Sequence, residues 1–235
     1  MSCEKVLNEN VFGGTLLYKS YGKKEVLRYA ELNVAKNGIV GIFGLNGSGK
    51  TTLLRILSGL DGAFQGTLYK TDFEDVAYMS VDSLHSPEMR VKDLINFYDT
   101  FLENQRTEKI YVELQAARIN PNAFLLSLST GMRQYVKFLL TVYSGASVCL
   151  FDEPLSNLDV NLRERVKKTL IMEINEEKLF IVTTHEIKEF EQLIDGFFIL
   201  KNGKLSTYYD CEEVVEMTGK SVGEFYKEKV NEKNY

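Results

Sequence analysis

The sequence predicts an α/β fold, with an antiparallel β segment at its N-terminal end and a helical segment inserted in the core. Three observations predict this fold. The continuous apolar run at 39–43, ahead of a glycine-rich loop, is typical of a strand buried on both faces, and the apolar run at 148–151 indicates a second strand over 147–151. Leu53, Leu54 and Leu57 recur at helical spacing after the first run. From about Val91 to Ser144 the apolar residues again follow helical spacing, which indicates the insertion.

The order of the elements follows from apolar periodicity and turn residues. Strands are expected at 15–18, 30–34 and 39–43, then a helix over 50–59 that ends at Gly59. A second β segment is expected at 66–69 and 75–79. After the helical block we expect a strand at 147–151, a helix from 161 to about 175, and a strand at 178–183. The last elements are a hairpin with Asn202-Gly203 as its tight turn and a helical tail from Asp210.

The chain of 235 residues is long enough to bury a sizeable core. We expect one domain over 1–235. The α/β core with its β subdomain would comprise 1–85 and 145–235, and the helical subdomain would comprise about 86–144. The sequence has no linker at the edges of the helical part, so it is expected to be an insertion and not an independent domain.

Composition excludes several classes of protein. The net charge is −5, so no nucleic-acid partner is expected. The three cysteines have neither metal-ligand spacing nor an even number for a disulfide framework, which fits a reducing compartment. Cys149 lies in an apolar run and is expected to be a small core residue. The sequence has no signal-peptide pattern and no long apolar span, so any action at a membrane would need a partner.

A glycine-rich loop is the strongest functional signal. Residues 44–51 match G-x-x-x-x-G-K-[S/T], between an expected buried strand and an expected helix. Inward-pointing backbone N–H groups and the helix N-terminus would hold phosphates, Lys50 would reach the β- and γ-phosphates, and the Thr51 hydroxyl would ligate Mg²⁺. The alternative is a chance glycine turn. The strand–loop–helix context favours the first interpretation, so we predict a P-loop NTPase core that binds a nucleoside triphosphate at this loop. The expected nucleotide-binding residues are Gly44, Leu45, Asn46, Gly47, Ser48, Gly49, Lys50, Thr51 and Thr52.

Two adjacent carboxylates follow the apolar run that ends at Phe151. Asp152 would lie at the carboxyl end of a strand, where α/β sheets bind ligands, and could hold Mg²⁺ through water. Glu153, one residue further, is suited to polarise an attacking water. The alternative is a solvated strand edge.

Three downstream segments, taken with the loop, resemble the ATP-binding subunits of ABC (ATP-binding cassette) proteins. They are 128–134 (LSTGMRQ), 148–154 (VCLFDEP) and Thr184-His185, and the resemblance extends from about Leu17 to about Lys204. It implies that Ser129 and Gly131 contact the nucleotide of a second subunit. Taken alone, this segment more often caps a helix, and the two interpretations are compatible. Residues 156–159 match the family's loop at the dimer interface, although Asp159 could simply cap the next helix.

Two further residues receive roles from the resemblance. His185 follows an expected strand and would contact the γ-phosphate and support the attacking water; a structural histidine is the alternative. Tyr21 would stack on adenine, or else be an ordinary tyrosine among 13. The sequence departs from the family after the second β segment, where a metal-contacting glutamine is expected. Val81 is nearest that place, and Asp82 and Ser83 are the candidate replacements.

The resemblance implies an ATP-hydrolysing subunit that closes with a second ABC subunit, as a homodimer or pseudo-dimer, on ATP and Mg²⁺. It would drive a separate transmembrane permease subunit from the cytoplasmic face of the membrane. The 131–134 segment (GMRQ) resembles exporters, so export is expected. The alternative is a soluble non-transport ABC ATPase, such as the iron–sulfur cluster assembly type. One compact cassette without heptads argues against translation-factor and chromosome types.

Overall fold

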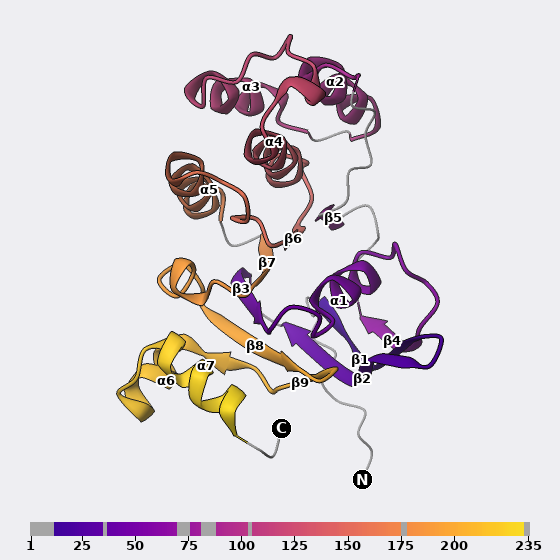
Figure 1. The fold of residues 1–235 in the computed structure, drawn as a ribbon, viewed down its shortest axis with the longest axis vertical. Helices are drawn as coiled ribbons and strands as arrows, with labels where there is room; N and C mark the ends of the chain where they lie inside the picture. The colour runs from indigo at the N-terminus through magenta and orange to yellow at the C-terminus, as the bar shows by residue number, and fades with distance from the viewer. Residues whose placement is uncertain are drawn as a thin grey trace. The chain divides into compact units, whose positions relative to one another are not determined.

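The computed structural model describes residues 12–34, 37–69, 76–80, 88–102, 105–174 and 178–232. The chain divides into two compact units (Figure 1). The first comprises residues 1–73 and 183–235, and the second comprises residues 74–182. The chain returns to the first unit within strand β7 (Leu179–Thr184).

The first unit contains an antiparallel sheet of three strands in the order β2-β1-β4. Strand β1 (Phe12–Tyr21) lies between β2 (Lys24–Val34) and β4 (Gln65–Tyr69). The turn from β1 to β2 contains Gly22 with a φ of 60°, a left-handed conformation that glycine adopts without steric cost. The predicted N-terminal antiparallel β segment is therefore confirmed.

The first unit also contains β3 (Gly38–Phe43) and β8 (Gly196–Lys201), which pair in parallel. Strands β9 (Lys204–Leu205) and β10 (Tyr209–Asp210) both pair with β8 in the antiparallel sense. The turn from β8 to β9 is the predicted Asn202-Gly203 pair, and both residues have positive φ, 51° and 79°. Two positive φ values favour a tight hairpin whose twist matches that of its strands.

Among its described residues, the first unit also contains the helices α1 (Lys50–Leu57), α6 (Cys211–Thr218) and α7 (Val222–Asn231), with a short 3₁₀ helix, η3, at Ile187–Glu189. Helix α7 lies beside β8 in Figure 1, and aromatic contacts hold it there. The ring centroids of Phe225 and Phe197 lie 6.2 Å apart, and those of Tyr226 and Phe43 lie 6.0 Å apart. The expected helical tail is therefore packed on the strand that precedes the glycine-rich loop.

The second unit contains β6 (Val148–Asp152), which pairs in parallel with β5 (Val76–Met79) and has β7 as its other neighbour. Every residue of β6 is buried, as the apolar run predicted. The unit's α-helices are α2 (Val91–Phe101), α3 (Thr107–Ala116), α4 (Thr130–Val142) and α5 (Val160–Glu173), with a 3₁₀ helix, η2, at Leu125–Ser127. The predicted helical block is therefore confirmed.

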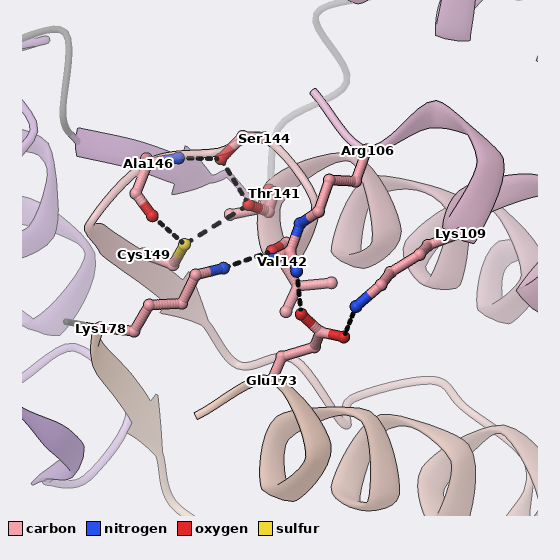
Figure 2. Close-up of polar contacts among 9 residues, drawn as sticks. All are labelled: Arg106, Lys109, Thr141, Val142, Ser144, Ala146, Cys149, Glu173 and Lys178. Atoms are coloured by element: carbon pink, nitrogen blue, oxygen red, sulfur yellow. Dashed lines mark hydrogen bonds and ion pairs between the residues drawn. The ribbon is translucent and has the colours of Figure 1, made fainter. Parts of the chain in front are cut away.

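A polar cluster in the second unit connects the start of α3 to the end of α5 (Figure 2). Glu173, 6% exposed, accepts from Arg106 at 2.7 Å and from Lys109 at 2.6 Å. A carboxylate at the last turn of a helix faces the negative end of the helix dipole, and these two cations offset that repulsion. Nearby, burial lowers the pKa of Lys178, whose ammonium donates to the Val142 carbonyl at 3.4 Å.

Every helix among the described residues is too short or too polar to span a bilayer. Cys149, the second residue of β6, is fully buried, as expected of a core residue. Its thiol donates to the Thr141 carbonyl at 3.4 Å, and burial raises its pKa to about 12.

Candidate nucleotide site

The glycine-rich loop connects β3 to α1 in the first unit. Strand β3 is buried from Ile39 to Phe43, so the loop begins where a buried parallel strand ends. Gly47 and Gly49 have φ values of 77° and 112°, which L side chains rarely adopt. These two residues curl the main chain ahead of α1, as the motif predicted.

The side chains of this loop suit an anionic ligand. Lys50 is only 6% exposed, and its ammonium donates to the carbonyl of Gly44 at 2.8 Å and to that of Leu45 at 3.4 Å. The Ser48 hydroxyl is buried and has no hydrogen-bond partner among the described residues. Buried hydroxyls without a partner are uncommon in folded proteins. A buried cation and an unpartnered hydroxyl in one loop fit phosphate oxygens.

The start of α1 adds to this preference. Gly49 is the N-cap, so no side chain caps the helix, and the first turn contains no acidic residue. The first N–H groups of the helix thus remain for an anion. Thr51 is exposed and Thr52 is half-buried in this first turn.

A cavity of about 430 Å³ opens beside the loop within the first unit. The loop residues that line it are Leu45, Asn46, Gly47 and Ser48. Its lining also includes three basic side chains and a single acidic one: Lys24, Arg28 and Lys201, and Glu25. The excess of basic side chains matches a negatively charged ligand.

Tyr21 lies at the end of β1, with half of its surface exposed. Its hydroxyl donates to Asp61 at 3.0 Å, and the Lys19 ammonium lies 4.9 Å from the ring centroid. These contacts fix the ring at the surface. Stacking on adenine stays a prediction.

Asp152 and Glu153 lie at the carboxyl end of β6 in the second unit. Asp152 is 1% exposed, and the Tyr78 hydroxyl donates to its Oδ2 at 3.4 Å. Glu153 is half-buried and has a φ of 50°, a left-handed conformation that is rare for residues other than glycine. The sharp change of direction after Asp152 separates the two carboxylates into different environments.

The residues that hold Glu153 were missed by the sequence interpretation. The Gln134 side-chain amide donates to the Glu153 carbonyl at 2.8 Å, and the Ser156 hydroxyl donates to the same oxygen at 2.9 Å. Gln134 belongs to the 128–134 segment, but its position on the expected helix did not indicate which residue it would contact. Tyr78 was equally unrecognised, because an aromatic residue in a strand usually signals only packing.

The 128–134 segment forms the start of α4. Ser129 is the N-cap, and its hydroxyl oxygen accepts from the Met132 N–H at 3.1 Å. Gly131 is buried, and a Cβ there would lie 2.5 Å from the Asn157 carbonyl oxygen. The segment therefore packs its backbone directly on the loop that follows β6, within the same unit.

Asp159 and His185 complete the predicted set. Asp159 is the N-cap of α5, and its Oδ1 accepts from the Leu162 N–H at 3.0 Å, as the capping alternative expected. His185 is exposed directly after β7, at the strand end where it was expected. Val81, Asp82 and Ser83 lie outside the described residues, so the replacement of the missing glutamine stays a prediction.

Comparisons with known proteins agree with this geometry. The family model described as ABC transporter matches residues 27–156. An uncharacterized ABC transporter ATP-binding protein of Methanocaldococcus jannaschii is 31% identical over 204 residues, 84% of this chain and 77% of the relative. An aliphatic sulfonates import ATP-binding protein of Shouchella clausii is 29% identical, over 83% of this chain and 78% of the relative. A solved structure of an ATP-binding subunit of an ABC transporter shares the fold, with a TM-score of 0.81, 21% identity, and coverage of 93% and 98%.

The chain therefore belongs to the ABC transporter ATP-binding family, and it is an ATPase with a P-loop α/β fold. The expectation of export finds no support, because the sulfonates relative is named as an import protein and so are those named for nucleosides and phosphonates.

Proposed function

We propose that this chain is the ATP-hydrolysing subunit of an ABC transporter and that it drives a separate transmembrane permease subunit. The observation that carries the proposal is the glycine-rich loop, with its buried Lys50 ammonium and its unpartnered Ser48 hydroxyl. Both features suit the phosphates of ATP. The names of the relatives, which are ATP-binding proteins of transporters, support the coupling to transport.

The proposed chemistry assigns one task to each group. Backbone amides of residues 44–52 hold the phosphates, and Lys50 neutralises their charge. The Thr51 hydroxyl and the Asp152 carboxylate are the hard oxygen donors that Mg²⁺ prefers. When bound, Mg²⁺ would neutralise developing charge on the phosphates.

Hydrolysis itself needs a base for water. We assign this role to Glu153, and His185 would orient the water and contact the γ-phosphate. Ser129 and Gly131 would contact the nucleotide of a facing ABC subunit, so the active form would be a homodimer or pseudo-dimer closed on two ATP molecules. Tyr21 would stack on the adenine ring.

We infer the place of action from the proposed coupling to a permease, and the names of the relatives support a direction. The subunit would lie on the cytoplasmic face of the membrane, held by its permease. Residues of about 86–144 would act as the helical subdomain, and 1–85 with 145–235 as the catalytic core. The names of the relatives favour import over export. They also disfavour a soluble assembly ATPase, since each is named for transport.

A Glu153→Gln variant tests the ATPase mechanism. It should bind ATP with the affinity of the natural protein, dimerise with ATP in light scattering, and hydrolyse it about 10²–10⁴-fold more slowly, because the water lacks its base. Glu216→Gln, at an exposed position of α6, is the matched control and should leave turnover unchanged. Turnover by Glu153→Gln at the natural rate would overturn the assignment.

Co-purification tests the transport role. The chain is tagged in its native cells, and the complex is extracted from membranes with detergent in the presence of ATP. A polytopic membrane protein in stoichiometric amount is the expected partner. Recovery with soluble scaffold proteins alone would instead indicate the assembly ATPase.

A further inference from the structure

We propose that Gln134 is a positioning residue, through which the N-terminal end of α4 sets the main chain of Glu153 and so the rate of ATP hydrolysis. The inference rests on the proposed role of Glu153 as the base that activates water. It adds a residue to that machinery which touches neither ATP nor water and acts only through the Glu153 peptide.

The contacts converge on one carbonyl oxygen. Gln134 is 8% exposed, and its Nε2 donates to the Glu153 carbonyl at 2.8 Å. The Ser156 hydroxyl donates to the same oxygen at 2.9 Å, and the Ser156 N–H donates to it at 3.1 Å. The two Ser156 contacts come from the same loop. The Gln134 contact is the one of the three that comes from another element, α4.

The conformation of Glu153 explains why this bond matters. Its φ of 50° is one that L residues rarely adopt, and such conformations persist where surrounding contacts hold them. The direction of a side chain follows from the φ and ψ of its own residue. Loss of the Gln134 bond would let the peptide relax and would move the carboxylate away from its working position.

Helix α4 is also packed against this loop at a second point. A Cβ on Gly131 would lie 2.5 Å from the Asn157 carbonyl oxygen, so the two backbones are in close contact. A shift of the start of α4 would therefore disturb both the Asn157 contact and the Gln134 bond.

A Gln134→Met variant tests the proposal, because methionine has similar length and lacks the donor. We expect the KM for ATP to stay within about twofold of the natural value while kcat falls about tenfold to hundredfold, as misplaced catalytic groups cause. Gln115→Met, at an exposed position of α3, is the matched control and should leave both constants unchanged. A natural kcat in Gln134→Met would overturn the proposal.

Ser156→Ala gives an independent check that does not depend on how Gln134→Met folds. It removes one donor from the same carbonyl, together with the longer contact of 3.4 Å from the Gln134 Nε2 to the Ser156 hydroxyl, and it keeps the Gln134 bond to the Glu153 carbonyl. We expect a smaller fall in kcat, with KM again unchanged. A rise in KM without any fall in kcat would show that the loop serves nucleotide binding, and the positioning role would be rejected.

A double-mutant comparison separates positioning from general structural support. In a Glu153→Gln background the residual turnover should not change when Gln134→Met is added, because the carboxylate that Gln134 positions is already absent. A further loss of the same size as in the natural background would contradict the proposal. If Glu153→Gln itself turns over at the natural rate, the proposed function fails. If that variant is inactive and Gln134→Met is fully active, only the present inference fails.

Discussion

The Lys50 ammonium donates a hydrogen bond of 2.8 Å to the carbonyl oxygen of Gly44, the first residue of the loop that ends at Lys50. The cation thus lies across its own loop, and a bound phosphate would compete with the Gly44 carbonyl for it. Lys50→Ala should weaken ATP binding by about 1.5–3 kcal/mol, the usual contribution of a hydrogen bond to a charged group. This corresponds to a Kd about tenfold to hundredfold higher in calorimetry.

Lys204→Ala is the control for this measurement. Lys204 is exposed on β9, so its loss changes the net charge equally without touching the loop. An equal loss of affinity in both variants would show that overall charge, and not the position of Lys50, governs binding.

The close approach of Gly131 to Asn157 leads to a stability prediction. A Cβ at Gly131 would lie 2.5 Å from a backbone oxygen, which cannot move aside as a flexible side chain would. We expect Gly131→Ala to lower the free energy of unfolding by about 1–3 kcal/mol, as overpacking does. Gly62→Ala is the control, because a Cβ there meets nothing within 4 Å. Equal urea midpoints for the two variants would contradict the close contact.

A partly buried ion pair in the first unit leads to a stability prediction. Lys19 donates to Asp61 and to the Ala63 carbonyl, each at 2.6 Å, and the Lys19 side chain is 6% exposed. Lys19→Met would leave the partly buried Asp61 without its cation and should cost about 1–3 kcal/mol in urea unfolding at neutral pH. Lys23→Met, in the exposed turn after β1, should be nearly neutral.

The same pair predicts a pH dependence. Burial would raise the pKa of Asp61, but hydrogen bonds from Lys19, the Ala63 N–H and Tyr21 outweigh it and hold the pKa below the ordinary 3.8. A lowered carboxyl pKa gives stability that is present above pH 3.8 and is lost as the pH falls through the folded-state value. The stability difference between the natural protein and Lys19→Met should therefore shrink in that acidic range. A difference that is constant with pH would contradict this.

The buried thiols should be inert. Burial raises the pKa of Cys149 to about 12 and that of Cys211 to about 12, so the reactive thiolate is scarce at mildly alkaline pH. In a Cys3→Ser variant, the thiols of the folded protein should react with a thiol reagent only as fast as the structure opens locally. In urea, both thiols should react with the reagent immediately. Rapid labelling of the folded variant would show that one of them is accessible.

Sequence alone predicted much of the fold because its signals are local. The buried runs before Gly44 and Glu153, the Asn202-Gly203 turn and the helical spacing each depend on a few neighbouring residues. The capping alternatives for Ser129 and Asp159 were confirmed for the same reason.

The contacts of the candidate site were harder to predict. The bond from Gln134 to the Glu153 carbonyl joins residues 19 apart in sequence, and the bond from Tyr78 to Asp152 joins residues 74 apart. Such partners depend on how α4 and β5 pack on β6, which periodicity does not specify. The positive φ of Glu153 was also unforeseen, because glutamate has no local preference for that conformation.

The cap of α4 has a chemical consequence for the residue that provides it. The Ser129 oxygen accepts the Met132 N–H, while the hydroxyl proton can still be donated outward from this exposed position. Aspartate would cap the helix as well as serine does, but it has no proton to donate and would repel an anion. Helix stability alone would therefore tolerate either residue. A helix N-terminus that contacts phosphate instead requires a hydroxyl, which accepts the backbone N–H and donates its own proton to the anion.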